Sequence, residues 1–138
     1  ELKSAFKMYS EIIQIKHIKK GDFVGYGASY RAQADEIIAT IPVGYDDGIF
    51  RYSRERNVSI NNKRYPIIGD VCMGMISVKI DNTVKMYDKV AIIGDAAPIS
   101  EVARHNKTSI YETMCNIGKQ IPRVYIKDGE IVAIEEGK

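Results

Sequence analysis

The chain contains 138 residues, of which 45% are hydrophobic and 28% charged, proportions typical of a single folded domain. Its 20 basic and 18 acidic residues nearly cancel, so neither nucleic acid nor an anionic membrane is expected as a partner. Cys72 and Cys115 show no metal-ligand spacing and cannot form a disulfide framework, so we expect no metal site and a reducing, cytoplasmic location. No apolar run approaches the ~20 residues that span a bilayer. Because the chain begins at Glu1 rather than Met, we expect it to be part of a longer protein.

Most of the elements expected along the chain are short strands. Alternating or β-branched runs predict strands at 11–16, 23–24, 36–43, 57–60, 64–68, 75–80, 89–94, 122–126 and 130–134. Asn61-Asn62-Lys63 and Lys127-Asp128-Gly129 predict hairpin turns. Strands this short, with no long helix between them, indicate an antiparallel barrel or sandwich. The expected fold class is therefore mainly β, with a small barrel-like sheet.

Two short helices near residues 100–117 are the exception to this pattern. Ser100 is expected to cap the first helix, with Val102 and Ala103 on its buried face. Thr108 or Ser109 is expected to cap the second helix, which should end at Gly118. The apolar side of the second helix is expected to hold Ile110, Met114 and Ile117.

Two short helices around Asn106 are also typical of a helix-turn-helix, which would make the chain a DNA-binding module. The second helix of such a motif reads the DNA, and it needs Arg or Lys to contact bases or phosphates. Residues 111–116 contain neither Arg nor Lys. The sequence therefore argues against DNA binding.

Two tyrosines that follow glycines are the most promising functional residues. Tyr26 lies between Gly25 and Gly27, and Tyr45 follows Gly44 in a second turn-rich segment. Glycine neighbours give the backbone conformational freedom, and because they have no side chains they leave the phenol uncovered. A turn or packing role is the common alternative for such tyrosines, so the residues alone predict a small β domain with a candidate site at Tyr26 and Tyr45.

Other conspicuous residues have simple structural interpretations when each is taken alone. Met73 beside Cys72 is expected to be a buried core pair, and the charged segment 51–56 a solvated loop. His17 is expected in a polar turn, and His105 near a helix end is expected to interact with the helix dipole rather than to act as a base.

Five motifs in order give the chain a more specific interpretation. They are VGYGASY at 24–30, IPVGYDDG at 41–48 with Arg51, GDVCM at 69–73, YE at 111–112 with Cys115, and IPRVY at 121–125. Together they resemble the C-terminal domain of alanine racemase, a fold type III pyridoxal-phosphate racemase family. The resemblance covers nearly the whole chain. It implies that residues 1–138 are the C-terminal β domain and that the family's N-terminal TIM barrel is absent from this chain.

The resemblance implies an activity, a cofactor and a partner. The family interconverts L- and D-alanine with pyridoxal 5'-phosphate, which the barrel mainly binds, and it works as a head-to-tail homodimer. Racemisation needs an acid/base on each face of the α-carbon. In the family one is a barrel lysine, and the resemblance assigns the other to Tyr26, reaching into the partner subunit's active site. A phenol with a pKa near 10 needs a neighbour to act as a base, and the family uses a barrel histidine for this.

The resemblance also assigns four residues around the substrate. The backbone N–H of Met73 would meet the substrate carboxylate, while Tyr45 and Tyr111 would narrow the pocket to about the size of a methyl group. Arg51 would line the entrance. Tyr111 favours alanine, because related serine racemases tend to carry a smaller polar residue at this position. The isolated domain is expected to be inactive.

Two positions depart from the family pattern. Gly74 stands where the family usually has Asp, and Asp70 stands where a basic residue is frequent. The charge at the entrance therefore differs, and the family's roles are not carried over to these two residues. A serine racemase relative and a non-catalytic binding or structural homologue are the alternatives.

Overall fold

The computed structural model describes residues 3–51, 53 and 56–137, apart from the side chain of Tyr26. The strands are β1 (Met8–Glu11), β2 (Gln14–Ile18), β3 (Phe23–Val24), β4 (Tyr30–Arg31), β5 (Glu36–Ile41), β6 (Asn57–Ile60), β7 (Lys63–Ile68), β8 (Ile76–Ile80), β9 (Lys89–Ile93), β10 (Arg123–Lys127) and β11 (Glu130–Glu135). Between them lie the short 3₁₀ turns η1 (Tyr26–Ala28) and η2 (Tyr45–Asp47) and the helices α1 (Ile99–His105) and α2 (Ile110–Cys115).

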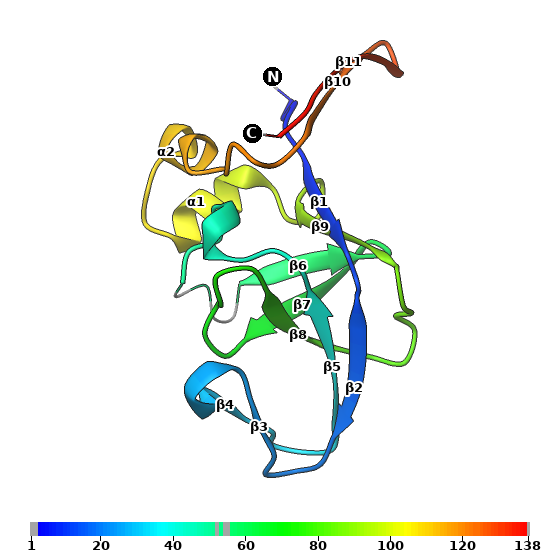
Figure 1. Cartoon of the computed structure of the whole chain (residues 1–138), viewed down its shortest axis with the longest axis vertical. Coiled ribbons are helices and arrows are strands. Elements are labelled where there is room, and N and C mark those ends of the chain that lie inside the picture. Colours follow the sequence, from blue (N-terminus) through cyan, green and yellow to red (C-terminus); the bar gives the residue numbers. More distant parts are fainter. Residues whose placement is uncertain (1–2, 52, 54–55, 138) are drawn as a thin grey trace.

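Seven antiparallel strands form the main sheet, in the order β1-β9-β6-β7-β8-β5-β2. The pairs β3–β4 and β10–β11 form two small separate sheets. In Figure 1, β3 and β4 lie at one end of the molecule, and the helices with the β10–β11 hairpin lie at the other. The expected mainly β fold with two short helices is confirmed.

The sheet curls because its two edge strands are consecutive in the chain. The expected strand at 11–16 is in fact two strands, and Ile12 and Ile13 separate them. The N–H of Ile12 donates to the carbonyl of Asp88, beside β9, and the N–H of Ile13 donates to Thr40 of β5. The chain thus passes from one edge of the sheet to the other at a fully buried Ile12, which gives a barrel-like half-closed shape.

Alternating side chains of the strands fill one main core. In β8, Ile76, Val78 and Ile80 point inward, and Val58 and Ile60 of β6 are fully buried against the same cluster. This two-residue period is the pattern that predicted the strands. A smaller cluster forms under the β3–β4 end of the molecule, from Ile18, Ala32, Ile38 and Ile68, with Val24 and Tyr30 packed against it.

Both expected hairpin turns are confirmed. Asn61 and Asn62 between β6 and β7 have φ values of 53° and 62°, and Asp128 and Gly129 between β10 and β11 have 51° and 79°. Positive φ at both central residues is typical of the type I′ turn, whose twist matches that of the strands it joins. Asn, Asp and Gly tolerate this conformation better than other residues do.

The start of α1 differs from the expectation. Pro98, not Ser100, occupies the N-cap position, and the carbonyl of Pro98 accepts from the N–H groups of Glu101 and Val102. The fixed φ of proline, here −67°, prepares the chain to enter the helix one residue later. The expected burial of Val102 and Ala103 is confirmed.

The expected cap of α2 is confirmed, but its length and its apolar face are not. The Oγ of Ser109 accepts a hydrogen bond of 3.1 Å from the N–H of Glu112. The helix ends at Cys115, before the predicted stop at Gly118. Ile110 and Met114 are exposed, whereas Ile117, beyond the helix, is buried in the main core.

The charged segment 51–56 is not wholly a solvated loop, as far as its described residues show. Ser53 and Arg56 are buried, and the Arg56 Nη2 donates to the carbonyl of Ile92 at 2.8 Å. Burial lowers the pKa of the Arg56 guanidinium to about 10, partly opposed by the charge of Glu101. Residues 52, 54 and 55 lie outside the described part of the chain. His17 was also expected in a turn, but it lies in β2, where it is exposed.

Replacing Ser109 by Ala tests the α2 cap. Loss of a serine cap costs about 1 kcal/mol, so amide hydrogen exchange in α2 should accelerate about fivefold. Hydrogen–deuterium exchange of the intact protein by mass spectrometry measures this. Ser100→Ala is the matched control, because α1 has no side-chain cap hydrogen bond. Equal exchange of α2 in the two variants would contradict the assignment.

Candidate functional site

A loop between β7 and β8 joins the two turns that carry Tyr26 and Tyr45. We call residues 69–75 the connecting loop. Its Cys72 carbonyl accepts from the N–H of Tyr45 at 3.0 Å, and its Met73 carbonyl accepts from the N–H of Asp46 at 3.0 Å. These two backbone bonds hold η2 directly against the loop.

Gly44 allows this close approach. A Cβ at position 44 would lie 2.2 Å from the carbonyl oxygen of Cys72 and 2.4 Å from that of Met73. Both distances are shorter than any real contact of a Cβ atom, and both are to backbone atoms that cannot rotate away. The glycine that precedes Tyr45 is therefore required by packing against the loop.

The same loop also holds the turn that carries Tyr26. The N–H of Asp70 donates to the Oγ of Ser29 at 2.9 Å, and Gly69 packs against the Ser29 side chain. The backbone of Tyr26 lies in η1, between Gly25 at φ 86° and Gly27 at φ 69°. These positive φ values explain the flanking glycines, since other residues rarely adopt them. The side chain of Tyr26 lies outside the described part of the structure.

Met73 and Tyr45 present their side chains to the surface. Met73 is 60% exposed and Tyr45 46% exposed, although both are large apolar or aromatic residues. The expectation that Met73 and Cys72 form a buried core pair is therefore wrong, because Cys72 is half-buried and Met73 projects outward. A loop that orders its backbone while exposing its side chains is typical of a binding surface.

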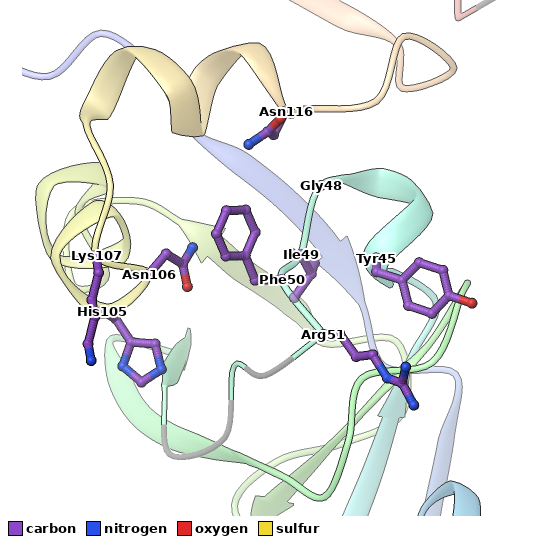
Figure 2. Close-up of a pocket in the computed structure, with 9 residues that line it drawn as sticks. All are labelled: Tyr45, Gly48, Ile49, Phe50, Arg51, His105, Asn106, Lys107 and Asn116. Atoms are coloured by element: carbon purple, nitrogen blue, oxygen red, sulfur yellow. The ribbon is translucent and has the colours of Figure 1, made fainter.

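Tyr45 and Arg51 line a common pocket of about 530 Å³ beside the helices. Figure 2 shows both side chains pointing to one side of residues 48–51, while His105 at the end of α1 and Lys107 on the loop after it lie across the pocket. The complete lining is Tyr45, Gly48, Ile49, Phe50, Arg51, His105, Asn106, Lys107 and Asn116. The N–H of Val71 donates to the carbonyl of Arg51 at 3.2 Å, so the connecting loop also fixes this position.

The sequence alone does not indicate that several of these residues line a pocket. His105, Asn106 and Lys107 come from a helix end far along the chain from Tyr45, and a single sequence does not place them opposite each other. His105 lies in the last turn of α1, where it was expected, and it also lines the pocket. Phe50 lies between the two sides of the pocket (Figure 2).

Tyr111 stands apart from these residues. It lies in α2, is 82% exposed and does not line the pocket, whereas Asn116 at the end of the same helix does. The helix end is nevertheless tied to η2. A Cβ on Gly48 would lie 2.4 Å from the carbonyl oxygen of Asn116, and the N–H of Gly118 donates to the carbonyl of Asp47 at 3.1 Å.

Side-chain hydrogen bonds of Asp47 and Gln120 also stabilise η2. The Asp47 carboxylate accepts from the N–H of Gly44 at 2.9 Å, and the Gln120 Nε2 donates to the same carboxylate at 2.9 Å. Gln120 also donates to the carbonyl of Asp46 at 2.8 Å. Tyr45 is thus presented by a turn that is held from both sides.

A buried carboxylate supports the Tyr26 turn from β5. The hydroxyl of Tyr30 donates to Glu36, at 3.0 Å from Oε1 and 2.9 Å from Oε2. Burial, followed by the hydrogen bond to Glu36, raises the pKa of Tyr30 to about 12. The Tyr30 phenol therefore stays protonated across the physiological pH range and donates a hydrogen bond to Glu36.

The described residues contain neither a cluster of metal ligands nor a membrane-spanning helix. No group of three or more His, Cys, Asp or Glu side chains is placed to hold a metal ion there. Within the same residues, no helix has the length and apolar character to cross a bilayer.

Comparison with known proteins identifies the family. The family model for the alanine racemase C-terminal domain matches residues 5–125. An alanine racemase of Geobacillus kaustophilus is 36% identical over 138 residues, covering 97% of this chain and 36% of the relative. The chain spans about a third of the length of the curated relatives that it matches.

Solved structures agree along almost the whole chain. An alanine racemase of Clostridium difficile 630 in complex with cycloserine has a TM-score of 0.92 at 34% identity, covering 99% of this chain and 37% of that one. An alanine racemase of Bacillus anthracis with bound L-Ala-P has a TM-score of 0.90 at 32% identity, covering 94% and 35%. Motifs, fold and family model coincide on the same residues, and the chain therefore belongs to the alanine racemase C-terminal domain family.

Proposed function

We propose that this chain is the C-terminal domain of a pyridoxal-phosphate-dependent alanine racemase that interconverts L- and D-alanine. The observation that carries the proposal is the connecting loop, which holds the turn of Tyr26, the turn of Tyr45 and the exposed Met73 together. In this proposal an N-terminal barrel supplies most of the cofactor site, and two protomers pair head to tail. Tyr26 then serves the active site of the partner subunit.

The groups on this surface suit contact with a small amino acid. Tyr45 offers a phenol and Met73 a thioether, and the N–H of Met73 has no acceptor among the described residues. An unpaired N–H on an exposed residue is a ready donor to a carboxylate. The phosphate of the cofactor needs several convergent N–H donors or a cation, and the proposal assigns these to the barrel. When bound, pyridoxal phosphate delocalises the negative charge left on the α-carbon.

Racemisation requires that the α-proton leave from one face and return on the other. Tyr26 takes the proton of L-alanine at its phenol oxygen, and it delivers a proton to the same face when D-alanine reacts. A barrel lysine acts on the opposite face. The pair of positive-φ glycines beside Tyr26 lets the backbone form the tight turn that presents this residue.

Substrate selection follows from the surrounding side chains. Tyr45 and Tyr111 narrow the site around the methyl group of alanine, the N–H of Met73 orients the carboxylate, and Arg51 lines the entrance. Tyr45 and Arg51 share the pocket wall, which supports this assignment. Tyr111 is highly exposed in this domain, so its contribution requires the complete assembly.

An assay of the full-length protein tests the proposal. With pyridoxal phosphate added, the protein should convert L-alanine to D-alanine, with kcat/KM about 10- to 100-fold higher than for L-serine. Coupled oxidation of the D-amino acid product measures both rates. A preference for serine would favour a serine racemase relative. Turnover of neither amino acid would favour a non-catalytic homologue.

A further inference from the structure

The Glu36 carboxylate is a buried charge on the first residue of β5. Its side chain is 2% exposed, a rare environment for a glutamate unless its oxygens are satisfied. Oε1 accepts from the Tyr30 hydroxyl at 3.0 Å and from the Gln33 N–H at 3.2 Å, and Lys79 Nζ lies 3.4 Å away. Oε2 accepts from Tyr30 at 2.9 Å. The carboxylate therefore joins three separate segments of the chain.

The contacts with Tyr30 and Gln33 hold one end of the Tyr26 turn, and the contact with Lys79 is to the main sheet. Tyr30 lies in β4, the return strand that follows η1, and Gln33 lies in the segment that leads from β4 to β5. Lys79 lies in β8, which pairs with β5 in the main sheet. Glu36 thus connects the small β3–β4 sheet, through its return strand, to the main sheet.

The small β3–β4 sheet is short and depends on contacts with the rest of the chain. β3 and β4 share two residue pairs, Phe23 with Arg31 and Val24 with Tyr30. An isolated two-stranded ribbon of this length is not stable without packing. At its base, the N–H of Gly21 donates to the carbonyl of Ala32 at 2.8 Å, and the N–H of Ala32 donates to the carbonyl of Asp22 at 2.9 Å. Nearer the Tyr26 turn, the Ser29 hydroxyl accepts from Asp70 N–H, and Val24 and Tyr30 pack on the smaller apolar cluster.

We propose that Glu36, through its hydrogen bonds to Tyr30, is a positioning residue for the catalytic turn of Tyr26. The proposal rests on the function proposed above. Glu36 does not touch the substrate. It fixes the strand that leaves η1, and this fixes the backbone from which the Tyr26 side chain extends.

The effect should be on proton transfer rather than on substrate binding. A reacting group displaced by about 1 Å can lose about 100-fold in rate, and weakening one of two anchors should cost less. Tyr45, Met73 and Arg51 are held by the connecting loop and not by Glu36. KM should therefore change little while the step at the phenol slows.

Exchange of the α-hydrogen with D₂O separates the two faces. L-alanine loses its α-hydrogen to Tyr26, whereas D-alanine loses it to the base on the other face and regains deuterium there. In the full-length enzyme with pyridoxal phosphate, Glu36→Gln and Tyr30→Phe should each lower exchange of L-alanine about tenfold. Exchange of D-alanine should stay within about twofold of the wild-type rate. NMR or mass spectrometry of the recovered alanine measures both rates.

The ratio of the two exchange rates is independent of how much protein is folded, since both are measured on one preparation. Tyr30→Phe removes a single oxygen and preserves the ring on the apolar cluster, so it serves as the second variant if Glu36→Gln folds poorly. The double variant should lose no more than the larger single effect, because the two residues act through one contact. Glu11→Gln, an exposed carboxylate on β1, is the matched control and should leave both rates unchanged.

Three results would overturn the proposal, and each leads to a different conclusion. Unchanged ratios in both variants, alongside a Tyr26→Phe variant that loses exchange of L-alanine, would exclude the Glu36 role alone. Equal losses for the two enantiomers would assign Glu36 a purely structural role. Absence of racemisation and exchange in the wild-type enzyme would remove the proposed function, and the Glu36 role with it.

Discussion

Replacing Tyr26 by Phe in the full-length protein should lower kcat/KM for alanine racemisation about 10³-fold. The change removes one oxygen, and a positioned acid/base contributes 10²–10⁴-fold to a rate, so about 10³-fold is expected. Phenylalanine keeps the ring, and the positive φ values of the backbone turn belong to the flanking Gly25 and Gly27, which the change leaves in place. The loss should therefore lie in the chemical step and not in folding.

Steady-state rates alone cannot show on which face the lost base acted. The equilibrium constant of a racemisation is one, so kcat/KM must fall equally in both directions. Exchange of the α-hydrogen in D₂O is the discriminating measurement, and Tyr26→Phe should abolish exchange of L-alanine while D-alanine continues to exchange. Tyr87→Phe is a suitable control, because Tyr87 is an exposed tyrosine in a turn and has no part in the proposed site. Small and equal losses for both enantiomers in Tyr26→Phe would contradict the assigned role.

Replacing Gly44 by Ala should disrupt the site from the backbone. The new Cβ would lie 2.2 Å and 2.4 Å from the carbonyl oxygens of Cys72 and Met73, so the connecting loop must move away. The same two carbonyls accept the N–H groups of Tyr45 and Asp46, and both bonds would break. We expect a loss of about 3 kcal/mol in stability and about 100-fold in kcat/KM.

Gly74→Ala is the matched control for stability. It lies in the same loop, but a Cβ there would have no atom within 4 Å. Thermal unfolding of the full-length holoenzyme, together with the racemase assay, measures the outcome. A Gly44→Ala variant as stable as Gly74→Ala would show that the loop can shift at little cost, and the role of Gly44 in joining the two turns would then be wrong.

Local rules predicted the strands and hairpins well. The turn at Asn61 and Asn62 and the turn at Asp128 and Gly129 depend on residues that accept positive φ, and this preference is intrinsic to those residues. The inward alternation in β8 depends only on the period of the strand. Such features need no knowledge of the rest of the fold.

Most of the incorrect predictions involve tertiary contacts. Ile12 and Ile13 fit a continuous strand locally, but the chain changes partner strand there to close the curl of the sheet. Arginine usually lies at the surface, yet the fold buries Arg56, and its guanidinium donates a hydrogen bond to the carbonyl of Ile92. At α1, two competing local signals were present, and the backbone restriction of Pro98 prevailed over the side-chain preference of Ser100.

The sequence proposes residues for the candidate site but says nothing of how they are arranged. The motifs pointed to Tyr45, Met73 and Arg51, and the structure brings these three together through the connecting loop. Nothing in their spacing indicates that η2 would be joined to the connecting loop by backbone hydrogen bonds, because this depends on the absence of a side chain at Gly44. The exposure of Met73 was missed for the same reason.

The connecting loop touches both turns at once, and this restricts how the protein can change. An insertion or deletion within residues 69–75 would displace the acceptors of Tyr45 and Asp46 and the donor to Ser29 together. Side-chain substitutions at the outward-facing Met73, by contrast, leave every one of these backbone bonds in place. New substrate preferences in this scaffold should therefore arise by point substitution, with the length of the loop kept constant.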